Sequence, residues 1–507
     1  MTKQLTQPDP PVSGADADSV QAVDAVIIGS GISGICAGVT LRREGISDFV
    51  ILSKETEFGG TWQRNTYPSV ACDVPSQLYS FGFAPNKEWS RVYSEGAEIQ
   101  RYLLDIVERH ELRRHARFKT EMLAGSWDRE RGRWLVSTNR GQFISRFLIL
   151  GTGSHHATKL PEISGIERFE GRIFHSSQWP AGYDGTGDRV AVLGTGASSI
   201  QITPGLAPTA EQVTVFQRTP AWVLPKPDWK HSPLERLIIR RVPGAQRALR
   251  ATAWALGEVF LASVFFPRFA QILSLLARLN IRLNVRDRRL RRALTPDYVM
   301  GCKRALVSNA FYKALNRPNV DLIPAAAAEI RPHSVVAADG TEVPVDTIVL
   351  ATGFYFTDSP DYGLIADKDG VILTDRWKGH PRAYLGTAIS GCPNLFVLWG
   401  PNAGTASAFV LVEAQCRYIA GALRLMRRHR LESIEVREDI ETAWKQNTDR
   451  IASKSVQNVG GCTTYYLDAT GHNGTVWPGS MLNMVRTLRH FDPDSYHLAA
   501  PGRPTGC

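Results

Sequence analysis

The sequence predicts an α/β protein with two Rossmann-like dinucleotide-binding domains and a helical insert. A buried apolar strand runs into a glycine-rich loop and then a helix at Gly29–Gly34, and the same succession returns at Gly194–Ser199. Between residues 226 and 297 a long helical pattern separates the two parts of the second domain. The chain of 507 residues is long enough for two or three domains with sizeable cores.

The first unit begins with residues 25–29, which are apolar without alternation, as in a strand buried on both faces. Gly29 allows a tight turn, Gly31 lets a pyrophosphate approach the backbone, and Gly34 lets the following helix pack closely on the strand. The N-terminus of that helix offers free N–H groups and a partial positive charge to phosphates. A strand at residues 49–52 completes the unit, so a dinucleotide site is predicted here.

The end of that second strand departs from the usual pattern. An acidic residue normally binds the ribose hydroxyls there, but this sequence has Ser53, which can form a hydrogen bond only without charge assistance. Glu55 is a candidate substitute. We therefore expect a nucleotide site with weakened affinity for the adenosine ribose.

The second unit starts with the buried strand 189–194, and Ser199 takes the place of its third glycine. A small residue is compatible with that position because it packs the helix on the strand and does not touch phosphate. The next strand, 213–216, leads to Arg218. An acidic residue there would favour NADH, whereas arginine accommodates a 2′-phosphate, so this site is predicted to bind NADPH.

The cysteines give no sign of a local pair. They stand at positions 36, 72, 302, 392, 416, 462 and 507, without a C-x-x-C or C-x-x-x-x-C spacing. We therefore expect neither a metal site nor a redox disulfide, and the scattered set suits a reducing cytoplasm. The N-terminus lacks the pattern of a signal peptide, and the polar residues 1–22 are predicted to form a disordered tail.

The positive charge of the chain is concentrated in one segment. The net charge is +10, and residues 226–297 carry all of it, with 15 Lys and Arg against 5 Asp and Glu. The rest of the chain has 44 basic and 44 acidic residues. No nucleic-acid motif accompanies this charge, so nucleic acid is not an expected partner. Three explanations stay open: a solvated face, a dock for an anionic membrane surface, and steering of an acidic partner or substrate.

Within that segment, residues 234–241 and 245–283 are predicted to be helical, with breaks at Pro243, Gly244 and Pro267. The apolar run 251–266 has only 16 residues and contains Glu258. It is too short and too charged to span a bilayer, so we expect amphipathic helices.

Two long motifs carry a resemblance to a known family. Residues 59–73 read GGTWQRNTYPSVACD, and residues 169–180 read FEGRIFHSSQWP. They resemble the motif G-G-x-W-x-x-x-x-[FY]-P-G-x-x-x-D and the fingerprint F-x-G-x-x-x-H-x-x-x-W-P of type I Baeyer–Villiger monooxygenases, with Ser69 in place of a glycine. The segments Gly151–Gly153, Lys303-Arg304 and Ala351–Gly353 resemble the same family, and the likeness spans about residues 22–498.

The resemblance implies an FAD-containing monooxygenase that uses NADPH and O2. Such an enzyme inserts one oxygen atom next to the carbonyl of a small-molecule ketone through a C4a-peroxyflavin, giving an ester or lactone. Arg304 would stabilise the negative charge of the reaction, because a guanidinium stays charged at any working pH. Asp73 would aim Arg304, His175 would orient the linker and the nicotinamide ribose, and Lys303 with Arg218 would hold the 2′-phosphate of NADPH.

The resemblance also implies a domain plan and a set of cofactor-binding residues. The FAD domain is expected at 23–158 and 356–507, and the NADPH domain at 159–225 and 298–355. The insert 226–297 would help to wall the substrate pocket. The expected cofactor-binding residues are Gly29, Gly31, Ile32, Ser33, Gly34, Ser53, Lys54, Gly60, Thr61, Trp62, Asp73, Tyr79, Met122, Gly194, Thr195, Gly196, Ala197, Ser198, Ser199, Arg218, Thr219, Lys303, Ala351, Thr352, Gly353 and Asn402.

Other functions compete with this interpretation. A related flavin monooxygenase would oxygenate nitrogen or sulfur, but the complete W-P ending of the fingerprint and the Asp73/Arg304 pair favour ketone oxygenation. A pyridine-nucleotide-disulfide reductase shares the double glycine-loop architecture but needs a redox cysteine pair, and the sequence shows no such motif. A non-catalytic flavoprotein would not need every motif position to be filled. We expect a cytoplasmic monomer or weak dimer, and the sequence does not identify the ketone.

Overall fold

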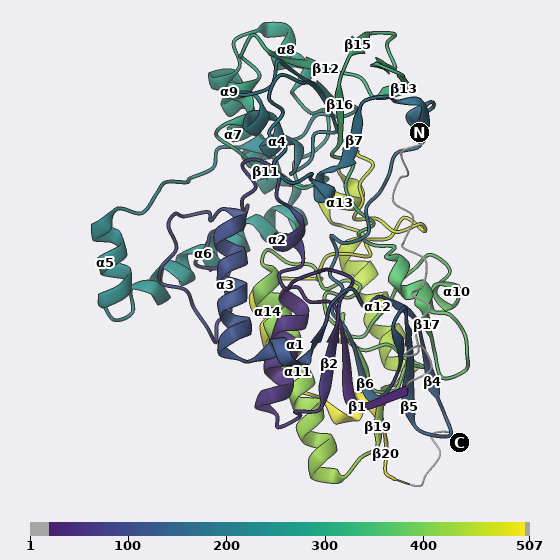
Figure 1. The fold of residues 1–507 in the computed structure, drawn as a ribbon. Coiled ribbons are helices and arrows are strands. Elements are labelled where there is room, and N and C mark those ends of the chain that lie inside the picture. The colour runs from purple at the N-terminus through teal and green to yellow at the C-terminus, as the bar shows by residue number, and fades with distance from the viewer. Residues whose placement is uncertain (1–19, 502–507) are drawn as a thin grey trace.

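The computed structural model describes residues 20–501 (Figure 1). Most of the predicted tail 1–22 lies outside the described residues. Its last three residues, however, belong to β1 (Val20–Ile28), so the strand begins five residues before Ala25. The reason is β6 (Gly141–Leu150), which is long enough to pair with β1 from Val20 onward.

The larger sheet has eight strands and carries the first glycine loop. In order the strands are β17 (Ile365–Ala366), β4 (Met122–Asp128), β5 (Arg133–Thr138), β6, β1, β2 (Phe49–Leu52) and β3 (Ala116–Arg117), with β18 (Leu395–Val397) paired to β6. The strands β6, β1, β2 and β3 are parallel, whereas β4, β5 and β6 form an antiparallel meander. Strands from both ends of the chain therefore build one sheet.

Helices cover one face of this sheet and create the largest buried core. They are α1 (Ile32–Arg43), α3 (Gly96–Arg109) and α11 (Ala408–His429). The apolar side chains of α3, such as Ile99, Leu103 and Ile106, recur every three or four residues and are buried. This packing fixes the start of α1, and with it the first glycine loop, at the carboxyl end of β1.

The second sheet is entirely parallel and carries the second glycine loop. Its order is β12 (Val320–Ile323), β9 (Gln212–Phe216), β8 (Arg189–Leu193), β16 (Thr347–Leu350) and β7 (Arg172–His175). The fingerprint residues 169–180 thus form an edge strand of this sheet as well as a connection. Gly171 is required there because a Cβ would meet the backbone oxygen of Asp346.

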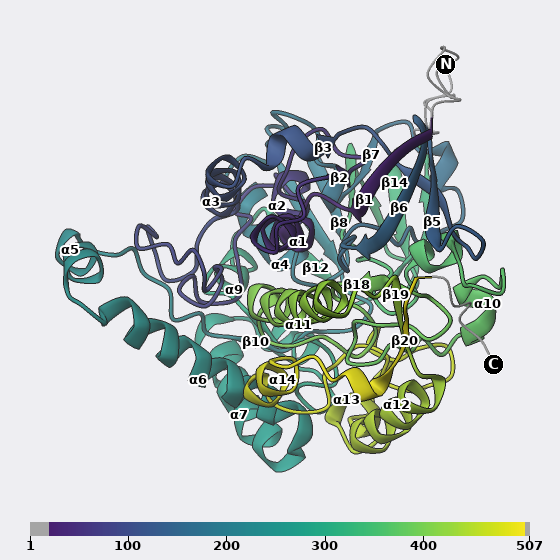
Figure 2. The same cartoon turned by 90° about the horizontal axis from the view of Figure 1, so that it is seen from below.

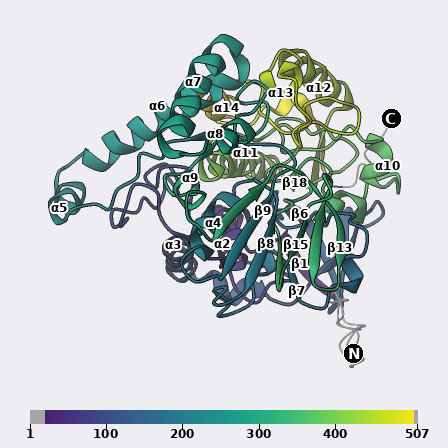
Figure 3. The same cartoon turned by 90° about the horizontal axis from the view of Figure 1, so that it is seen from above.

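The basic segment folds into four helices that lie to one side of the two sheets (Figure 3). They are α5 (Pro233–Arg241), α6 (Ala245–Phe265), α7 (Pro267–Asn284) and α8 (Arg288–Ala293). Ser232 and Glu235 form a capping box at α5, and Pro267 occupies the first turn of α7, so local chemistry sets these boundaries. In Figures 1 to 3, α5 and the start of α6 extend away from the body.

Helix α6 is longer than the apolar run 251–266 and begins six residues before it. It has 21 residues, and by length and composition alone it could cross a membrane. Its contacts argue otherwise, because Glu258 accepts hydrogen bonds from the backbone N–H groups of Met481 and Leu482. These bonds join α6 to the start of α14 (Met481–Thr487), so the helix packs against the protein.

The remaining elements are short strands and helices. The short sheets are β10 (Val223–Leu224) with β11 (Leu306–Val307), β13 (Ala327–Arg331) with β14 (Ser334–Ala337) and β15 (Glu342–Pro344), and β19 (Ser433–Val436) with β20 (Tyr496–Ala499). The other helices are α2 (Thr61–Arg64), α4 (Ser199–Leu206), α9 (Phe311–Ala314), α10 (Leu373–Trp377), α12 (Glu438–Ala452) and α13 (Val456–Val459).

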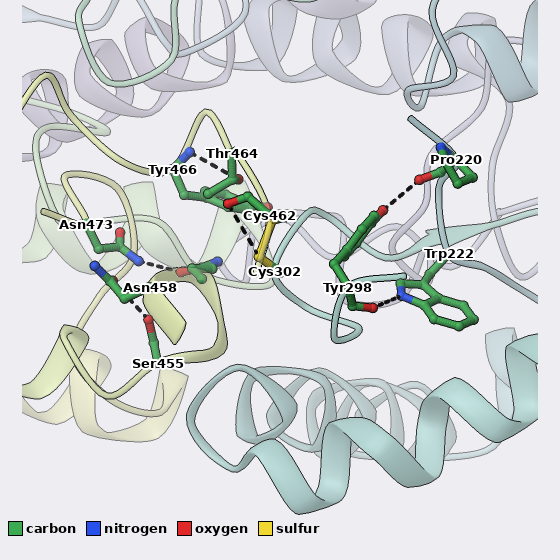
Figure 4. The surroundings of a disulfide bond; sticks show 11 residues. Pro220, Trp222, Tyr298, Cys302, Ser455, Asn458, Cys462, Thr464, Tyr466 and Asn473 are labelled. Carbon is green, nitrogen blue, oxygen red and sulfur yellow. Dashed lines mark hydrogen bonds between the residues drawn. A yellow bond between two sulfur atoms is a disulfide. The ribbon is translucent and has the colours of Figure 1, made fainter. Parts of the chain in front are cut away.

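The cysteine spacing did not suggest a disulfide, but Cys302 and Cys462 form one (Figure 4). The two residues are 160 positions apart, and spacing rules detect only pairs that are close in sequence. The bond ties the segment before Arg304 to the loop that holds Tyr466. The cysteine pattern therefore gives no support for a reducing compartment.

Candidate active site

A cleft of about 530 Å³ lies where the first glycine loop, the motif 59–73, α6 and the loop around Tyr466 meet. From the sequence-predicted set it brings together Gly29, Gly31, Ile32, Ser33, Ser53, Lys54, Gly60, Thr61, Trp62, Asp73, Tyr79, Met122, Ala197, Ser198 and Arg304. These residues are up to 275 positions apart in sequence, so only the tertiary fold assembles them. The cleft is the candidate active site.

The first glycine loop is shaped by steric limits. Gly29 has φ +105°, a conformation that favours glycine, and a Cβ there would overlap the Gly151 carbonyl. A Cβ on Gly34 would fall well inside contact distance of the Gly29 oxygen, so only glycine lets α1 pack this closely on β1. A Cβ on Gly60 would lie 2.8 Å from the Cα of Gly31, so these two backbones form a narrow floor in the cleft.

The position that usually carries a ribose-binding acid is occupied by a serine pair. The hydroxyls of Ser53 and Ser30 are 2.8 Å apart, and both residues are buried. The substitute Glu55 lines the cleft but forms an ion pair with Arg64, whose Nε lies 3.3 Å from its carboxylate. A nucleotide hydroxyl at this position would therefore meet a serine pair that is already hydrogen-bonded and carries no charge.

Asp73 and Arg304 form the charged pair of the cleft. Asp73 Oδ2 accepts a hydrogen bond from Arg304 at 2.6 Å, although 231 residues separate them. Their side chains keep 25% and 35% of their surface exposed toward the cleft, so the guanidinium retains donors for another group. The charge of Asp73 raises the pKa of Arg304 further above its ordinary value, which keeps the guanidinium positive.

The second glycine loop lies at the start of α4. A Cβ on Gly194 would come within 2.6 Å of the Ala351 oxygen, whereas one on Gly196 would meet nothing within 4 Å. Ser199 is fully buried, as expected for a position that packs helix on strand. The open space at Gly196 leaves the N-terminus of α4 free to receive a phosphate.

Two cations that the sequence assigns to the 2′-phosphate, Arg218 and Lys303, lie near one another. Arg218 follows β9 and is exposed, and the ammonium of Lys303 lies 5.4 Å from the centre of the Tyr298 ring. Burial lowers the pKa of Lys303, and the positive charge of Arg218 lowers it further. Two like charges held near one another are suited to a dianionic group such as a phosphate.

His175 lies outside the cleft and is buried. Its Nδ1 accepts from the backbone N–H of Ser177 at 3.2 Å, and its Nε2 donates to the Gly353 oxygen at 3.1 Å. Burial lowers its pKa to about 4, so the ring is neutral at physiological pH. The geometry therefore suits a residue that positions the backbone and does not suit a proton donor.

Several other sequence-predicted residues do not line the cleft. Gly34 packs beneath it, Lys303 and Arg218 lie near one another outside it, and Ala351, Thr352 and Gly353 follow β16. Asn402 is buried, with its amide nitrogen on the Asn473 carbonyl and its oxygen bound by Lys445. Its polar atoms are thus engaged within the protein.

Sequence reasoning missed some cleft residues. His155, Gln457 and Tyr466 all line the cleft. Burial lowers the pKa of His155 to about 4, with the charge of Arg304 as the second cause, so a neutral imidazole lies near the guanidinium. The position of His155 two residues after Gly153 was an available signal, whereas nothing local marks Gln457.

A second polar cluster lies away from the cleft. His380, Asp468 and His472 have ligand atoms within 4.8 Å of one another, a spacing that could hold a metal ion. Both ring nitrogens of His380 are engaged, with Nδ1 2.7 Å from Asp468 and Nε2 3.0 Å from Asp449. A ring that donates from both nitrogens is protonated and has no lone pair for a metal.

This cluster should make stability depend on pH. Hydrogen bonds to Asp449 and Asp468 raise the pKa of His380 to about 8, above the ordinary value of about 6.5. Its contribution to folding is therefore complete below about pH 6.5 and is lost as the pH rises through about 8. In thermal melts followed by circular dichroism, we expect Tm to fall over this range more steeply than in His380→Gln. The control His490→Gln changes an exposed histidine and should behave like the unaltered protein, and equal slopes in all three would contradict the assignment.

Comparison with known proteins finds a matching family and close relatives in sequence. The pattern of the flavin-binding monooxygenase-like family matches residues 22–368. A protein of Streptomyces coelicolor named Baeyer-Villiger monooxygenase is 41% identical over 483 residues, which cover 94% of this chain and 93% of that one.

Solved structures show the same arrangement. The closed crystal structure of cyclohexanone monooxygenase superimposes with a TM-score of 0.85 at 26% identity, covering 95% of this chain and 100% of the other. A crystal structure of OTEMO in complex with FAD and NADP gives a TM-score of 0.86 at 27% identity with the same coverage. The likeness therefore extends over nearly the whole chain.

Proposed function

The chain belongs to the flavin-binding monooxygenase-like family, and from this premise we propose that it is an FAD-containing, NADPH- and O2-dependent Baeyer–Villiger monooxygenase. Its substrate is a small-molecule ketone, and its product is an ester or lactone. The observation that carries this proposal is the Asp73–Arg304 ion pair, which aims a permanent positive charge into a cleft lined by the first glycine loop.

The residues of the cleft fit FAD. Gly31 and Gly60 keep the floor free of side chains, and α1 presents its N-terminus to the position of a pyrophosphate. NADPH would lie at Gly194–Ser199 with its 2′-phosphate between Arg218 and Lys303. When bound, FAD supplies the redox chemistry that transfers electrons from NADPH to O2.

The residues of this chain supply orientation and charge. Arg304 would bind the ketone oxygen and stabilise the negative charge that develops on it, while Asp73 holds the guanidinium in place. His175 would fix the backbone at Gly353, where the second sheet returns toward the cleft. The apolar side chains of α6 would exclude water from the ketone.

A ketone panel tests this function directly. The purified flavoprotein, given NADPH and isotopically labelled O2, should consume O2 in step with a ketone and release an ester or lactone that carries one labelled oxygen. Oxygenation of amines or sulfides without any ester from ketones would instead support the related heteroatom-oxygenating class. NADPH oxidation without any oxygenated product would overturn both.

Arg218 and Lys303, which would form a clamp on the 2′-phosphate of NADPH, give a second prediction. Arg218→Ala and Lys303→Ala should each raise the KM for NADPH about 10- to 100-fold, because each removes a charge-assisted contact worth about 1.5–3 kcal/mol. The KM for NADH should stay unchanged, since NADH lacks that phosphate. Stopped-flow measurement of flavin reduction checks this, with Arg172→Ala, an exposed arginine on edge strand β7, as the matched control. Equal losses with both nucleotides would contradict the clamp.

The proposal also covers location and partners. We propose a cytoplasmic enzyme, where NADPH is supplied, acting as a monomer or weak dimer. Peripheral contact of residues 226–297 with a membrane is part of the proposal, and the exposed face of the insert supports it.

A further inference from the structure

The solvent-exposed surface of the insert, called its outer face below, is unusually apolar for a protein surface. The large apolar side chains exposed there are Trp229, Leu234, Leu237, Ile238, Val242, Leu249, Leu256, Val259, Phe266, Ile272, Leu275, Leu276, Leu279 and Leu283. They are fourteen of the twenty-three such side chains in residues 20–501, although the segment is about one seventh of the chain. Scattered apolar residues are ordinary, but a concentration of this kind marks a surface that meets another apolar body.

On α7 these side chains form one stripe. Ile272, Leu275, Leu276, Leu279 and Leu283 follow the spacing of a single helical face. The opposite face packs inward through buried Ala270, Ala277 and Ile281. The helix therefore differs from an ordinary surface helix, because it carries apolar side chains on its outer side as well as on its inner side.

Arginines frame the same stripe. Arg268 and Arg282 are exposed and lie on the stripe's side of α7 by helical spacing, and Arg286, Arg288 and Arg289 follow it. Of all the arginines in residues 226–297, only Arg240 has an ion-pair partner among the described residues, which is Glu88. The exposed arginines beside the stripe, such as Arg268, Arg282 and Arg286, therefore present positive charge without an ion-pair partner in residues 20–501, at the edge of an apolar surface.

The insert forms part of the wall of the cleft. This wall includes Ala253, Gly257, Phe260, Leu261 and Val264 from the inner face of α6. Leu256 belongs to both surfaces, since it lines the cleft and is also 53% exposed. An apolar path therefore continues from the interior of the cleft to the outer face of the insert.

From this arrangement we infer that the outer face of the insert docks on an anionic lipid bilayer and that the enzyme takes its ketone from that bilayer. The apolar stripe enters the interface while the arginines meet lipid phosphates. This inference rests on the proposed function and narrows its substrate class to ketones that dissolve in membranes. A second copy of the chain fits less well, because symmetric pairing would bring two segments of charge +10 together.

Helix α6 does not span that bilayer. Its inner face lines the cleft, and its Glu258 caps α14. A helix held in this way lies along a surface, with only its outer side available to lipid. The structure thus assigns α6 to the boundary between the bilayer and the cleft.

Vesicle co-sedimentation of the flavin-loaded enzyme tests the docking. We expect it to sediment with vesicles of phosphatidylglycerol and phosphatidylcholine at low salt, and to be released at high salt because screening shortens the reach of the arginines. Arg282→Ser should weaken partitioning about five-fold, as expected for one basic residue near an anionic surface. Leu275→Glu with Leu279→Glu should abolish sedimentation.

Matched variants separate docking from general damage. Leu123→Glu and Leu160→Glu alter exposed leucines elsewhere and should sediment normally. All variants should oxidise a water-soluble ketone at the normal rate, whereas the α7 variants should lose turnover of a ketone embedded in vesicles. If the unaltered enzyme does not oxidise the water-soluble ketone, the proposed function fails. The docking is tested separately, by sedimentation.

Three results would overturn the inference. The first is no sedimentation of the unaltered enzyme with anionic vesicles at low salt. The second is equal sedimentation with pure phosphatidylcholine, which would mean apolar adsorption without recognition of charge. The third is a dimer in analytical ultracentrifugation that Leu275→Glu dissociates, because the face would then be an interface between copies of this chain.

Discussion

Replacing Arg304 with alanine is expected to lower ester formation about 100- to 1000-fold, which corresponds to about 2.7–4 kcal/mol of transition-state stabilisation. The guanidinium is the cation that the structure aims into the cleft, and Asp73 binds it at 2.6 Å. Alanine leaves Asp73 facing the same space without a counter-ion, so the variant replaces a positive field at the ketone by a negative one.

Two controls separate this role from a structural one. Arg304→Lys keeps the charge but loses the planar fork, so it should recover little activity. Flavin content and anaerobic flavin reduction by NADPH should stay partly intact in both variants, because the first glycine loop lies on separate elements. Arg64→Ala removes a different cleft arginine, which is paired with Glu55, and should affect flavin binding more than ester formation. Ester formation at a near-normal rate in Arg304→Ala would refute the proposed role.

Local rules predicted the elements well where backbone chemistry decides the outcome. Three of the four helices of the insert, α5, α6 and α7, begin and end within a few residues of the prediction, because Pro233, Gly244 and Pro267 mark their boundaries. The fourth, α8, was not predicted. The strand 49–52 agrees with β2, since a short buried run between turns has few alternatives. The start of β1 was misjudged because its partner β6, and not its own sequence, decides how far it extends.

Contacts between distant segments were harder to foresee. The Cys302–Cys462 bond depends on how the loop after α13 folds back, and no local pattern encodes that path. The engagement of Glu55 by Arg64 likewise required the geometry of α2 against the end of β2. Asp73 and Arg304 were paired in advance only through the family resemblance, since nothing in their spacing indicates contact.

Gly34 in the first glycine loop is required for steric reasons. In Gly34→Ala the new methyl group would overlap the backbone oxygen of Gly29, and neither backbone can yield without moving α1 away from β1. We expect loss of bound FAD and a destabilisation at the upper end of the range for overpacking, about 3 kcal/mol or more. The ratio of flavin to protein absorbance and the Tm of the purified protein measure the two effects.

Gly38→Ala is the matched control on the same helix. A Cβ there would lie 3.1 Å from Leu112 and 3.2 Å from Ile51, both at the ends of flexible side chains. Those side chains can shift, and alanine favours a helix interior over glycine by about 1 kcal/mol. Gly38→Ala should therefore retain FAD with a nearly unchanged Tm. If Gly34→Ala also retained FAD and stability, the close approach of α1 to β1 would not be what shapes this site.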